Sequence, residues 1–293
     1  MHYTGEVYRH PMEGYTPLLE VTIGCSYNKC AFCTMYQRTP FITTKMEIIE
    51  EDLKELKAKS KGEAVKRICL VNADPFVLST DKLIAISDLI IKYFPEIETI
   101  TGYASIRNFT KKTPKDLLRL KAARFNDFHI GLESGYDPAL KTINKGYTAK
   151  EARVELKKIK EAGLRWDALL MMGVAGKGNG SKNIEATAKL LNEFPPYMIS
   201  LMPMSVTPGS KLEIITNRGE YVELTERELL EEEKEFLEAL RFEDCYFFGS
   251  HNFNLIPISG KLKDKAKIIE YIDEKMNELS ATILSSVKPR GAI

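Results

Sequence analysis

Short apolar runs alternate with amphipathic stretches along most of the chain. Apolar runs rich in β-branched residues are typical of buried strands, and apolar positions three or four apart are typical of helices. In 46–59, the residues Ile48, Ile49, Leu53 and Leu56 fall on one helical face. Strands are expected at 17–23, 65–71, 97–104, 127–132, 165–174 and 198–206. Helices are expected at 46–59, 80–93, 114–122, 138–143, 148–162 and 182–193, and through much of 210–242.

This alternation predicts an α/β fold with a mostly parallel sheet, because parallel strands need helical crossovers. Six strand–helix units are fewer than the eight of a closed TIM barrel. We therefore expect a partial (β/α)6 TIM-like barrel, with a doubly wound open sheet as the alternative. The expected organisation is an N-terminal arm over 1–15, the core over 16–208 and a helical C-terminal extension over 209–293 that caps the barrel mouth. Both folds place an active site at the carboxyl ends of the strands.

Composition narrows the function classes. The 293 residues include 42 basic and 41 acidic side chains, a net charge of +1, which gives no signal for nucleic acid or a membrane surface. No apolar run reaches membrane-spanning length, and the N-terminus lacks the features of a signal peptide. We therefore expect a cytoplasmic protein with no membrane partner. Three of the five cysteines are clustered, which is unlike a disulfide framework.

The cysteine cluster follows the first expected strand. Cys25, Cys30 and Cys33 stand in one short loop, and thiolates from one loop can converge on a metal ion or cluster. Closed zinc sites and ordinary iron–sulfur clusters usually have four ligands. Three thiolates leave one metal position open for a cofactor or substrate. The alternatives are a zinc site or a redox pair, since Cys30-Ala31-Phe32-Cys33 is also a C-x-x-C motif.

Two motifs carry a resemblance to a known family. The loop reads C-x4-C-x2-C with Phe32 before the last cysteine, and Gly131-Leu132-Glu133-Ser134-Gly135 ends the fourth expected strand. Together they resemble the radical S-adenosylmethionine (radical SAM) superfamily over roughly residues 15–260. The first cysteine gap is one residue longer than that family's commonest spacing. A looser similarity links the chain to an uncharacterised group beside oxygen-independent coproporphyrinogen oxidases, but no tetrapyrrole signature accompanies it.

The resemblance implies both the cofactors and the chemistry. Cys25, Cys30 and Cys33 would hold a [4Fe–4S] cluster whose fourth iron binds SAM. Reductive cleavage of SAM would yield a 5′-deoxyadenosyl radical that abstracts hydrogen from an unknown substrate under anaerobic conditions, with flavodoxin or ferredoxin as electron donor. One alternative is a non-catalytic iron–sulfur or zinc protein with a structural cysteine triad. Another is a different α/β enzyme whose cysteines are redox thiols.

Residues that follow the early strands are candidates to hold SAM. Phe32 is expected against the adenine ring, or as a core aromatic. Asp74 is expected near the amino group of SAM, or in a plain strand-to-helix turn. Arg107 is expected to pair with the SAM carboxylate, with Ser105 a weaker candidate there, or else to form a surface salt bridge.

Residues that follow the later strands complete the predicted pocket. Glu133, followed by Ser134, is expected to reach the ribose or amino group of SAM, or to form an internal salt bridge. Met172 and Gly173 are expected to pack near adenine, and Met202 forms either the pocket floor or part of the core.

Two residues near the C-terminus are candidates for catalysis. His251 lies in a polar, aromatic segment and is an acid–base candidate, although a structural histidine bonded to backbone is the commoner case. Cys245 is either a thiol on the substrate side or a residue without a role in the chemistry.

Overall fold

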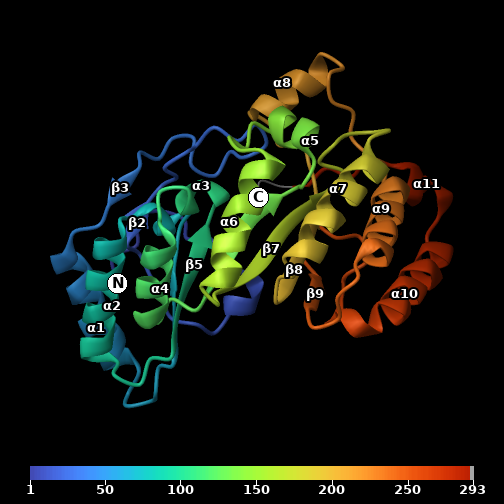
Figure 1. The fold of residues 1–293 in the computed structure, drawn as a ribbon. Coiled ribbons are helices and arrows are strands. Elements are labelled where there is room, and N and C mark those ends of the chain that lie inside the picture. The colour runs from blue at the N-terminus through green and yellow to red at the C-terminus, as the bar shows by residue number, and fades with distance from the viewer. Residues whose placement is uncertain (291–293) are drawn as a thin grey trace. The chain divides into compact units, whose positions relative to one another are not determined.

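A computed structural model describes residues 1–290, shown as a ribbon in Figure 1. Eight strands of the main sheet follow the order β1-β4-β5-β6-β7-β8-β9-β10, and β2 and β3 form a separate pair. The strands are β1 Leu18–Leu19, β2 Thr22–Ile23, β3 Ile42–Thr43, β4 Arg67–Leu70, β5 Thr99–Ala104, β6 Asp127–Glu133, β7 Arg165–Met172, β8 Met198–Pro203, β9 Tyr246–Gly249 and β10 Ile258–Lys261. The helices are α1 Met46–Lys59, α2 Thr80–Tyr93, α3 Ile106–Phe109, α4 Pro114–Ala122, α5 Asp137–Thr142, α6 Ala149–Glu161, α7 Gly180–Glu193, α8 Lys211–Asn217, α9 Glu226–Ala239, α10 Lys265–Glu278 and α11 Ala281–Ser285, with short 3-10 turns at Pro11–Glu13, Pro75–Val77 and Leu262–Asp264.

This architecture confirms the predicted α/β class with a mostly parallel sheet. β1, β4, β5 and β6 pair in parallel, and so do β7, β8 and β9. Among the described pairs of the main sheet, only β10 runs antiparallel, against β9. Helices connect the parallel strands, as right-handed crossovers require.

The chain forms two compact units, each described by itself. Unit 1 comprises Met1–Asn28, Arg38–Gly131 and Glu155–Trp166. In this unit α1 and α2 lie side by side (Figure 1). Apolar residues of β4 and β5, such as Ile68 and Ile100, are fully buried. The alternation of apolar strand and amphipathic helix therefore builds this core directly.

Unit 2 comprises Lys29–Gln37, Leu132–Val154 and the chain from Asp167 onward. Its helix α9 packs against α7 and α10 (Figure 1). Leu170 of β7 and Ile199 of β8 have no exposed surface. The two strands β9 and β10 also belong here, and the sequence analysis predicted neither. They lie in the region expected to be a helical extension, whose proposed capping role stays a prediction.

The first expected strand, 17–23, is divided into β1 and β2. The interruption follows from a side chain of unit 1, because the Asn72 amide donates to Glu20 Oε2 (3.0 Å) and to the Thr22 carbonyl (2.7 Å). A side-chain amide thus takes the place of a strand neighbour at this point. β2 then pairs antiparallel with β3 and closes the cysteine loop at its base.

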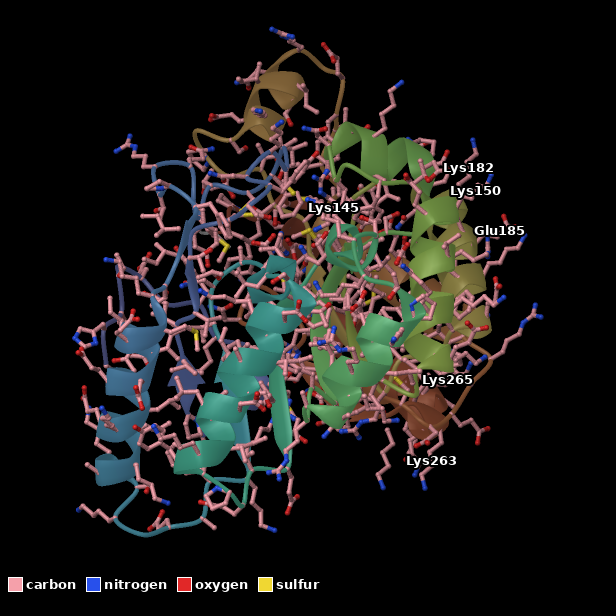
Figure 2. All side chains as sticks on the ribbon, turned by 60° about the vertical axis from the view of Figure 1, so that its left-hand side comes forward. Lys145, Lys150, Lys182, Glu185, Lys263 and Lys265 are labelled. Carbon is pink, nitrogen blue, oxygen red and sulfur yellow. The ribbon has the colours of Figure 1, made fainter. Side chains whose placement is uncertain are left out.

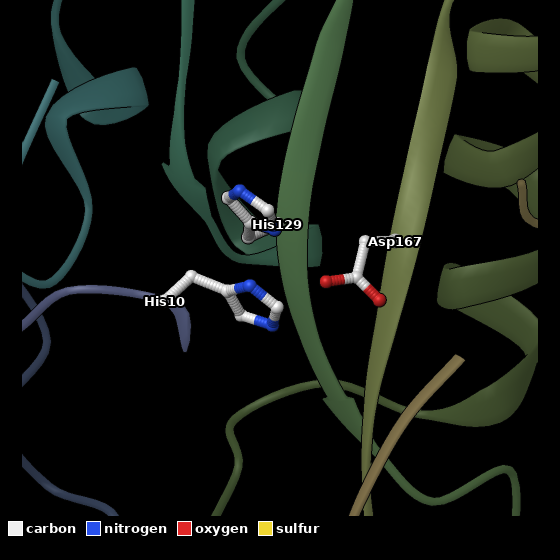
Figure 3. A group of neighbouring side chains, drawn as sticks. All are labelled: His10, His129 and Asp167. Atoms are coloured by element: carbon white, nitrogen blue, oxygen red, sulfur yellow. The ribbon is translucent and has the colours of Figure 1, made fainter. Parts of the chain in front are cut away.

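A buried ionic network ties together the amino ends of strands in unit 1. Arg67 donates to Glu13 through Nε (3.1 Å to Oε1) and to Asp127 through Nη2 (2.8 Å to Oδ1). Glu13 also contacts His129 Nε2 at 3.0 Å, and the His129 ring stacks on His10 with centroids 4.3 Å apart (Figure 3). The network lies at the strand ends away from the cysteine loop.

Within residues 1–290, no helix is both long enough and apolar enough to span a bilayer.

Candidate cofactor site

The cysteine loop begins at a turn that only glycine fits. Gly24 has φ 72°, in the left-handed region, and a Cβ atom there would lie 2.7 Å from the Pro40 carbonyl oxygen. A non-glycine residue would therefore be strained and would also clash with backbone. The turn sets the direction in which Cys25 leaves β2. Cys25 is partly exposed as a residue.

In unit 1, Asp74 holds the residue that follows Cys25. The Ser26 N–H donates to Asp74 Oδ1 at 3.1 Å, and the Ser26 hydroxyl donates to Oδ2. Asn108 Nδ2 donates to the same Oδ2 at 3.4 Å. Burial raises the pKa of Asp74, and the bonds from Ser26 and Asn108 partly oppose this shift. Asp74 therefore anchors the cysteine loop, a role that the sequence analysis did not predict, and its contact with SAM stays a prediction.

Arg107 contacts the same part of the loop. Its guanidinium lies over the Tyr27 ring, 4.0 Å from the centroid. Arg107 is exposed, and Ser105, two residues earlier, donates its backbone N–H to Asn108 Oδ1 at 2.6 Å. In unit 1, Asp74 thus contacts Ser26 and Arg107 contacts Tyr27, the two residues after Cys25. The predicted pairing of Arg107 and Ser105 with the SAM carboxylate stays a prediction.

In unit 2, the second part of the loop is fixed through its backbone. Ala31 N–H donates to the Ile143 carbonyl (2.8 Å), and the Ala31 carbonyl accepts from Leu212 N–H (2.7 Å). Phe32 is 7% exposed and belongs to an apolar cluster with Ile143 and Met171. Its environment is therefore that of a core aromatic, the alternative that the sequence left open. Both remaining cysteines of the triad are partly buried and pack against this cluster, at Cys30 and Cys33.

Glu133 forms the internal salt bridge that was its alternative role. Lys145 Nζ lies 2.7 Å from Glu133 Oε1, and 5.9 Å from the centroid of the Phe32 ring. Burial by itself lowers the pKa of Lys145, but the negative charges of Glu133 and Cys30 outweigh burial and raise it above its usual value. In Figure 2, Lys145 lies among other side chains, whereas Lys150 and Lys182 extend outward. A buried ammonium beside Cys30 favours the thiolate form, which is the form that binds metal.

The remaining pocket candidates of unit 2 are engaged in packing and backbone bonds. The buried Ser134 hydroxyl donates to Asn183 Oδ1 at 2.6 Å. Gly173 has φ 74°, donates its N–H to Glu232 Oε2 (2.6 Å) and accepts from the Tyr221 hydroxyl (2.8 Å). Met172 is buried, and Met202 is partly buried against the apolar cluster of Phe32. Their expected contacts with SAM are not tested by these bonds.

The two catalytic candidates, His251 and Cys245, both lie in unit 2 and contact nearby backbone groups. His251 Nδ1 accepts from the Phe253 N–H at 3.2 Å, and burial lowers the pKa of the imidazole. Cys245 is 5% exposed, its thiol lies 3.6 Å from the Tyr246 carbonyl oxygen, and burial raises its pKa. These environments are those of a backbone-bonded histidine and an inert thiol, so the proposed acid–base and thiol roles gain no support.

Left-handed backbone marks several strand ends, and sequence reasoning missed two of these positions. Asn72 after β4 has φ 74°, and Glu133 at the end of β6 has φ 59°. Such conformations cost about 1–3 kcal/mol for non-glycine residues and cluster at functional sites. Asparagine tolerates this region, so Asn72 offered a weak signal. Glutamate offered none, because nothing in its chemistry favours positive φ.

Comparison with known proteins decides the family. The family model described as "Radical SAM superfamily" matches residues 19–191, which include the cysteine loop and Glu133. The chain belongs to the radical SAM superfamily. Members of this family are enzymes, and in general they use SAM and a [4Fe–4S] cluster and need a reductant as well as a substrate.

Individual relatives of this radical SAM enzyme are distant. An uncharacterised protein of Methanocaldococcus jannaschii, MJ0486, is 24% identical over 231 residues, 76% of this chain and 70% of that protein. A tRNA-2-methylthio-N(6)-dimethylallyladenosine synthase of Janthinobacterium is 25% identical over 69% of this chain. The aligned region spans only 46% of the synthase, so the activity of that protein does not pass to this chain.

Solved structures support the fold of the radical SAM enzyme. Methylornithine synthase (PylB) superposes with a TM-score of 0.55 at 15% identity, over 88% of this chain and 68% of the synthase. Coproporphyrinogen III oxidase (HemN) of Escherichia coli superposes with a TM-score of 0.52 at 17% identity, over 69% of this chain and 51% of the oxidase. At such identities the likeness shows the shared fold alone, which agrees with the predicted partial TIM-like barrel.

The donor set of this chain fits an iron–sulfur cluster. Thiolates are the ligands that iron–sulfur clusters use. Each triad cysteine is partly exposed as a residue, in contrast to the buried Cys69 and Cys245. Lys145 adds a positive charge near Cys30, as an anionic ligand requires.

Proposed function

We propose that Cys25, Cys30 and Cys33 bind a [4Fe–4S] cluster and that the chain binds SAM beside it. The observation that carries this proposal is the contrast among the five cysteines, because the triad cysteines are partly exposed as residues and the other two are buried. The family match over residues 19–191 supports the same assignment. With both cofactors bound, reductive cleavage of SAM supplies a 5′-deoxyadenosyl radical that abstracts hydrogen from a substrate.

The residues of the chain would hold and orient these groups. In unit 1, Asp74 fixes the backbone after Cys25 through Ser26. In unit 2, the backbone bonds of Ala31 fix the segment between Cys30 and Cys33. Lys145 stabilises negative charge at Cys30. Each part of the loop is thus held within its own unit, which lowers the cost of ordering that part when the cluster binds.

The SAM-binding residues follow from the candidates named above. We assign the amino group of SAM to the neighbourhood of Asp74, its carboxylate to Arg107 with Ser105, and its ribose to Glu133 with Ser134. Adenine is assigned to the apolar surface of Phe32, Met172, Gly173 and Met202. The electron donor is expected to be a flavodoxin or ferredoxin, and the location to be cytoplasmic.

Anaerobic reconstitution tests the proposal. The wild-type protein, supplied with iron and sulfide and then reduced, is expected to give the electron paramagnetic resonance spectrum of a [4Fe–4S] cluster that changes when SAM is added. Dithionite and SAM together are expected to yield 5′-deoxyadenosine. Replacing any one triad cysteine with alanine is expected to abolish both signals, because three thiolates are the minimum set that leaves one iron open.

The control and the rival explanations have distinct outcomes. Cys69→Ala is expected to keep the cluster, because Cys69 is fully buried in β4. A cluster whose spectrum ignores SAM, or tightly bound zinc in its place, would indicate a non-catalytic protein with a structural triad. Activity in metal-free protein would indicate redox thiols.

A further inference from the structure

A cavity in unit 2 contains an acidic side chain for which the proposed chemistry gives no role. The cavity measures about 20 Å³, room for a water molecule or a small polar group. Side chains from β7, β8, α9, the segment between β9 and β10, and the C-terminal segment line it. Among them are Met172, Met202, Glu233, Asn254 and Arg290.

Glu233 is buried, and one of its carboxylate oxygens has no partner among the described residues. Glu233 is only 4% exposed, and its Oε1 atom has no hydrogen-bond partner within residues 1–290. A buried carboxyl group without a hydrogen bond costs free energy, so such groups are normally satisfied by protein, water or ligand. Burial raises the pKa of Glu233 to about 8. The group is therefore poised to ionise when a positive charge arrives.

A second acceptor in the same cavity also lacks a donor. Asn254 Oδ1 is buried without a partner among the described residues, while the amide nitrogen donates to the Leu201 carbonyl at 3.3 Å. When Glu233 is ionised, it and Asn254 Oδ1 both accept hydrogen bonds, so a partner of that state would have to be a donor. Two acceptors beside apolar walls are the environment that suits an ammonium group.

Arg290 is the one cation among the described residues that line the cavity, and it is already paired. Arg290 Nη2 donates to both carboxylate oxygens of Glu226, at 2.6 and 2.7 Å, and Arg290 Nε donates to the Phe253 carbonyl at 2.9 Å. The charges of Glu226 and Arg290 thus balance each other. Glu232, the neighbour on α9, accepts from Gly173 instead. None of these groups supplies the positive charge that Glu233 lacks.

We propose that this cavity binds the primary ammonium group of a small substrate, with Glu233 as its counter-ion and Asn254 Oδ1 as a further acceptor. That the ligand is a substrate rests on the proposed function, since Met172 and Met202 also belong to the predicted adenine surface. Binding of the ammonium itself requires only unit 2. The two statements can therefore fail separately.

Methionine methyl groups provide a reporter inside the cavity. The full chain, reconstituted anaerobically, is labelled with 13C at its methionine methyls, and the Met172 and Met202 signals are assigned with Met→Leu variants. Methylammonium chloride is the probe, and sodium chloride and methanol control for ionic strength and for size. Both signals are expected to shift with methylammonium alone. The affinity is expected to rise between pH 6.5 and 9, because Glu233 ionises in this range while the amine stays protonated.

Matched variants decide the assignment. Glu233→Gln is expected to weaken methylammonium binding by about tenfold or more, because the charge-assisted bond is lost. Glu231→Gln carries the same change on an exposed position of α9 and is expected to bind as the wild type does. Asn254→Ala is expected to weaken binding by a smaller factor. Unmoved methionine signals, or equal shifts in Glu233→Gln, would overturn the proposal, whereas loss of the cluster or of SAM cleavage would not change this binding result.

Discussion

Glu13 in unit 1 and Glu233 in unit 2 are equally buried but chemically opposite. Glu13 is 2% exposed and Glu233 is 4% exposed. Glu13 accepts bonds from Arg67 and contacts His129, and although burial alone would raise its pKa, these partners lower it well below its usual range. Glu233 has no such partner within residues 1–290, and burial raises its pKa to about 8. The number of partners, and not the depth of burial, separates a structural acid from a candidate binding group.

The difference has a physical reason. An ionised carboxylate in a poorly polar interior is stable only if opposite charge and hydrogen bonds replace water. In the folded chain, charge and hydrogen bonds replace water around Glu13, so its ionised form contributes to the stability of the fold. Glu233 lacks such partners, so its ionised form lowers the stability of the fold and would be stabilised by a hydrogen-bond donor that binds beside it. A buried acid with a raised pKa is therefore a candidate binding group when it lacks a hydrogen-bond or ion-pair partner.

The largest expected effect comes from removing the shared partner in unit 1. Arg67→Met leaves Glu13 and Asp127 buried without their guanidinium, and breaking a buried ionic network of this kind costs about 3–5 kcal/mol. Urea unfolding at pH 7 measures the change in free energy of unfolding. A loss below about 1 kcal/mol, as for a surface ion pair, would mean that the network contributes little to stability.

Replacing Glu233 is expected to raise stability at high pH, in contrast to replacing Arg67. The pKa of Glu233 is raised on folding from 4.5 to about 8, so the folded state holds one more proton between these values. Wild-type stability is therefore expected to fall as pH rises from 5 to 8. Glu233→Gln stays neutral and is expected to be more stable than the wild type by about 1–3 kcal/mol at pH 9, with little difference at pH 5.

Thermal and urea unfolding across pH 5–9 tests this prediction. Glu231→Gln serves as the control, because its position on α9 is exposed and its pH dependence is expected to match the wild type. Equal stability of Glu233→Gln and wild type at pH 9 would show that Glu233 already has a partner in solution. In that case the comparison with Glu13 no longer holds.

Lys112 in unit 1 is an intermediate case that sharpens the comparison. Its buried ammonium donates to the carbonyls of Phe76 (2.8 Å) and Leu78 (2.9 Å), and burial lowers its pKa to about 8. Neutral partners thus satisfy its hydrogen bonds without balancing its charge. The folded state holds fewer protons than the unfolded state between pH 8 and 10.5, so wild-type stability is expected to rise with pH there.

Lys112→Met removes this titration and leaves two carbonyls without donors. The variant is expected to be less stable than the wild type by about 1–2 kcal/mol at pH 10 and by less at pH 8. Denaturant unfolding at these two pH values measures the difference. A difference that does not change with pH would place the titration of Lys112 outside the range inferred from its burial.

Sequence patterns predicted the fold better than the site. The α/β class and nearly all the strands and helices through β8 follow from local apolar periodicity, which tertiary packing here reinforces. The strands β9 and β10 were missed because Tyr246–Gly249 and Ile258–Lys261 are short and lack clear alternation. Helix α10, Lys265–Glu278, lies in the region expected to be a helical extension, but no separate helix was assigned there.

The sequence identified the cysteine motif of the site, but it did not predict which side chains pair with one another. The cysteine spacing indicated the family because three thiols in one loop have few other uses. The bonds of Asp74 to Ser26 and of Glu133 to Lys145 depend on which side chains the fold brings together. Glu233 was not among the predicted site residues, because α9 carries many glutamates and sequence gives no measure of how deeply each one is buried.

The smallest expected effect concerns a second arginine at Asp127. Arg165 Nη2 donates to Asp127 Oδ2 at 3.0 Å, but its side chain is 60% exposed, whereas that of Arg67 is 29% exposed. Water can replace an exposed guanidinium, so Arg165→Met is expected to cost less than about 1 kcal/mol. The two variants make the same chemical change at the same carboxylate, and urea unfolding compares them directly. If both cost the same, exposure of the partner would be irrelevant, and the distinction between Glu13 and Glu233 would have to rest on geometry instead of desolvation.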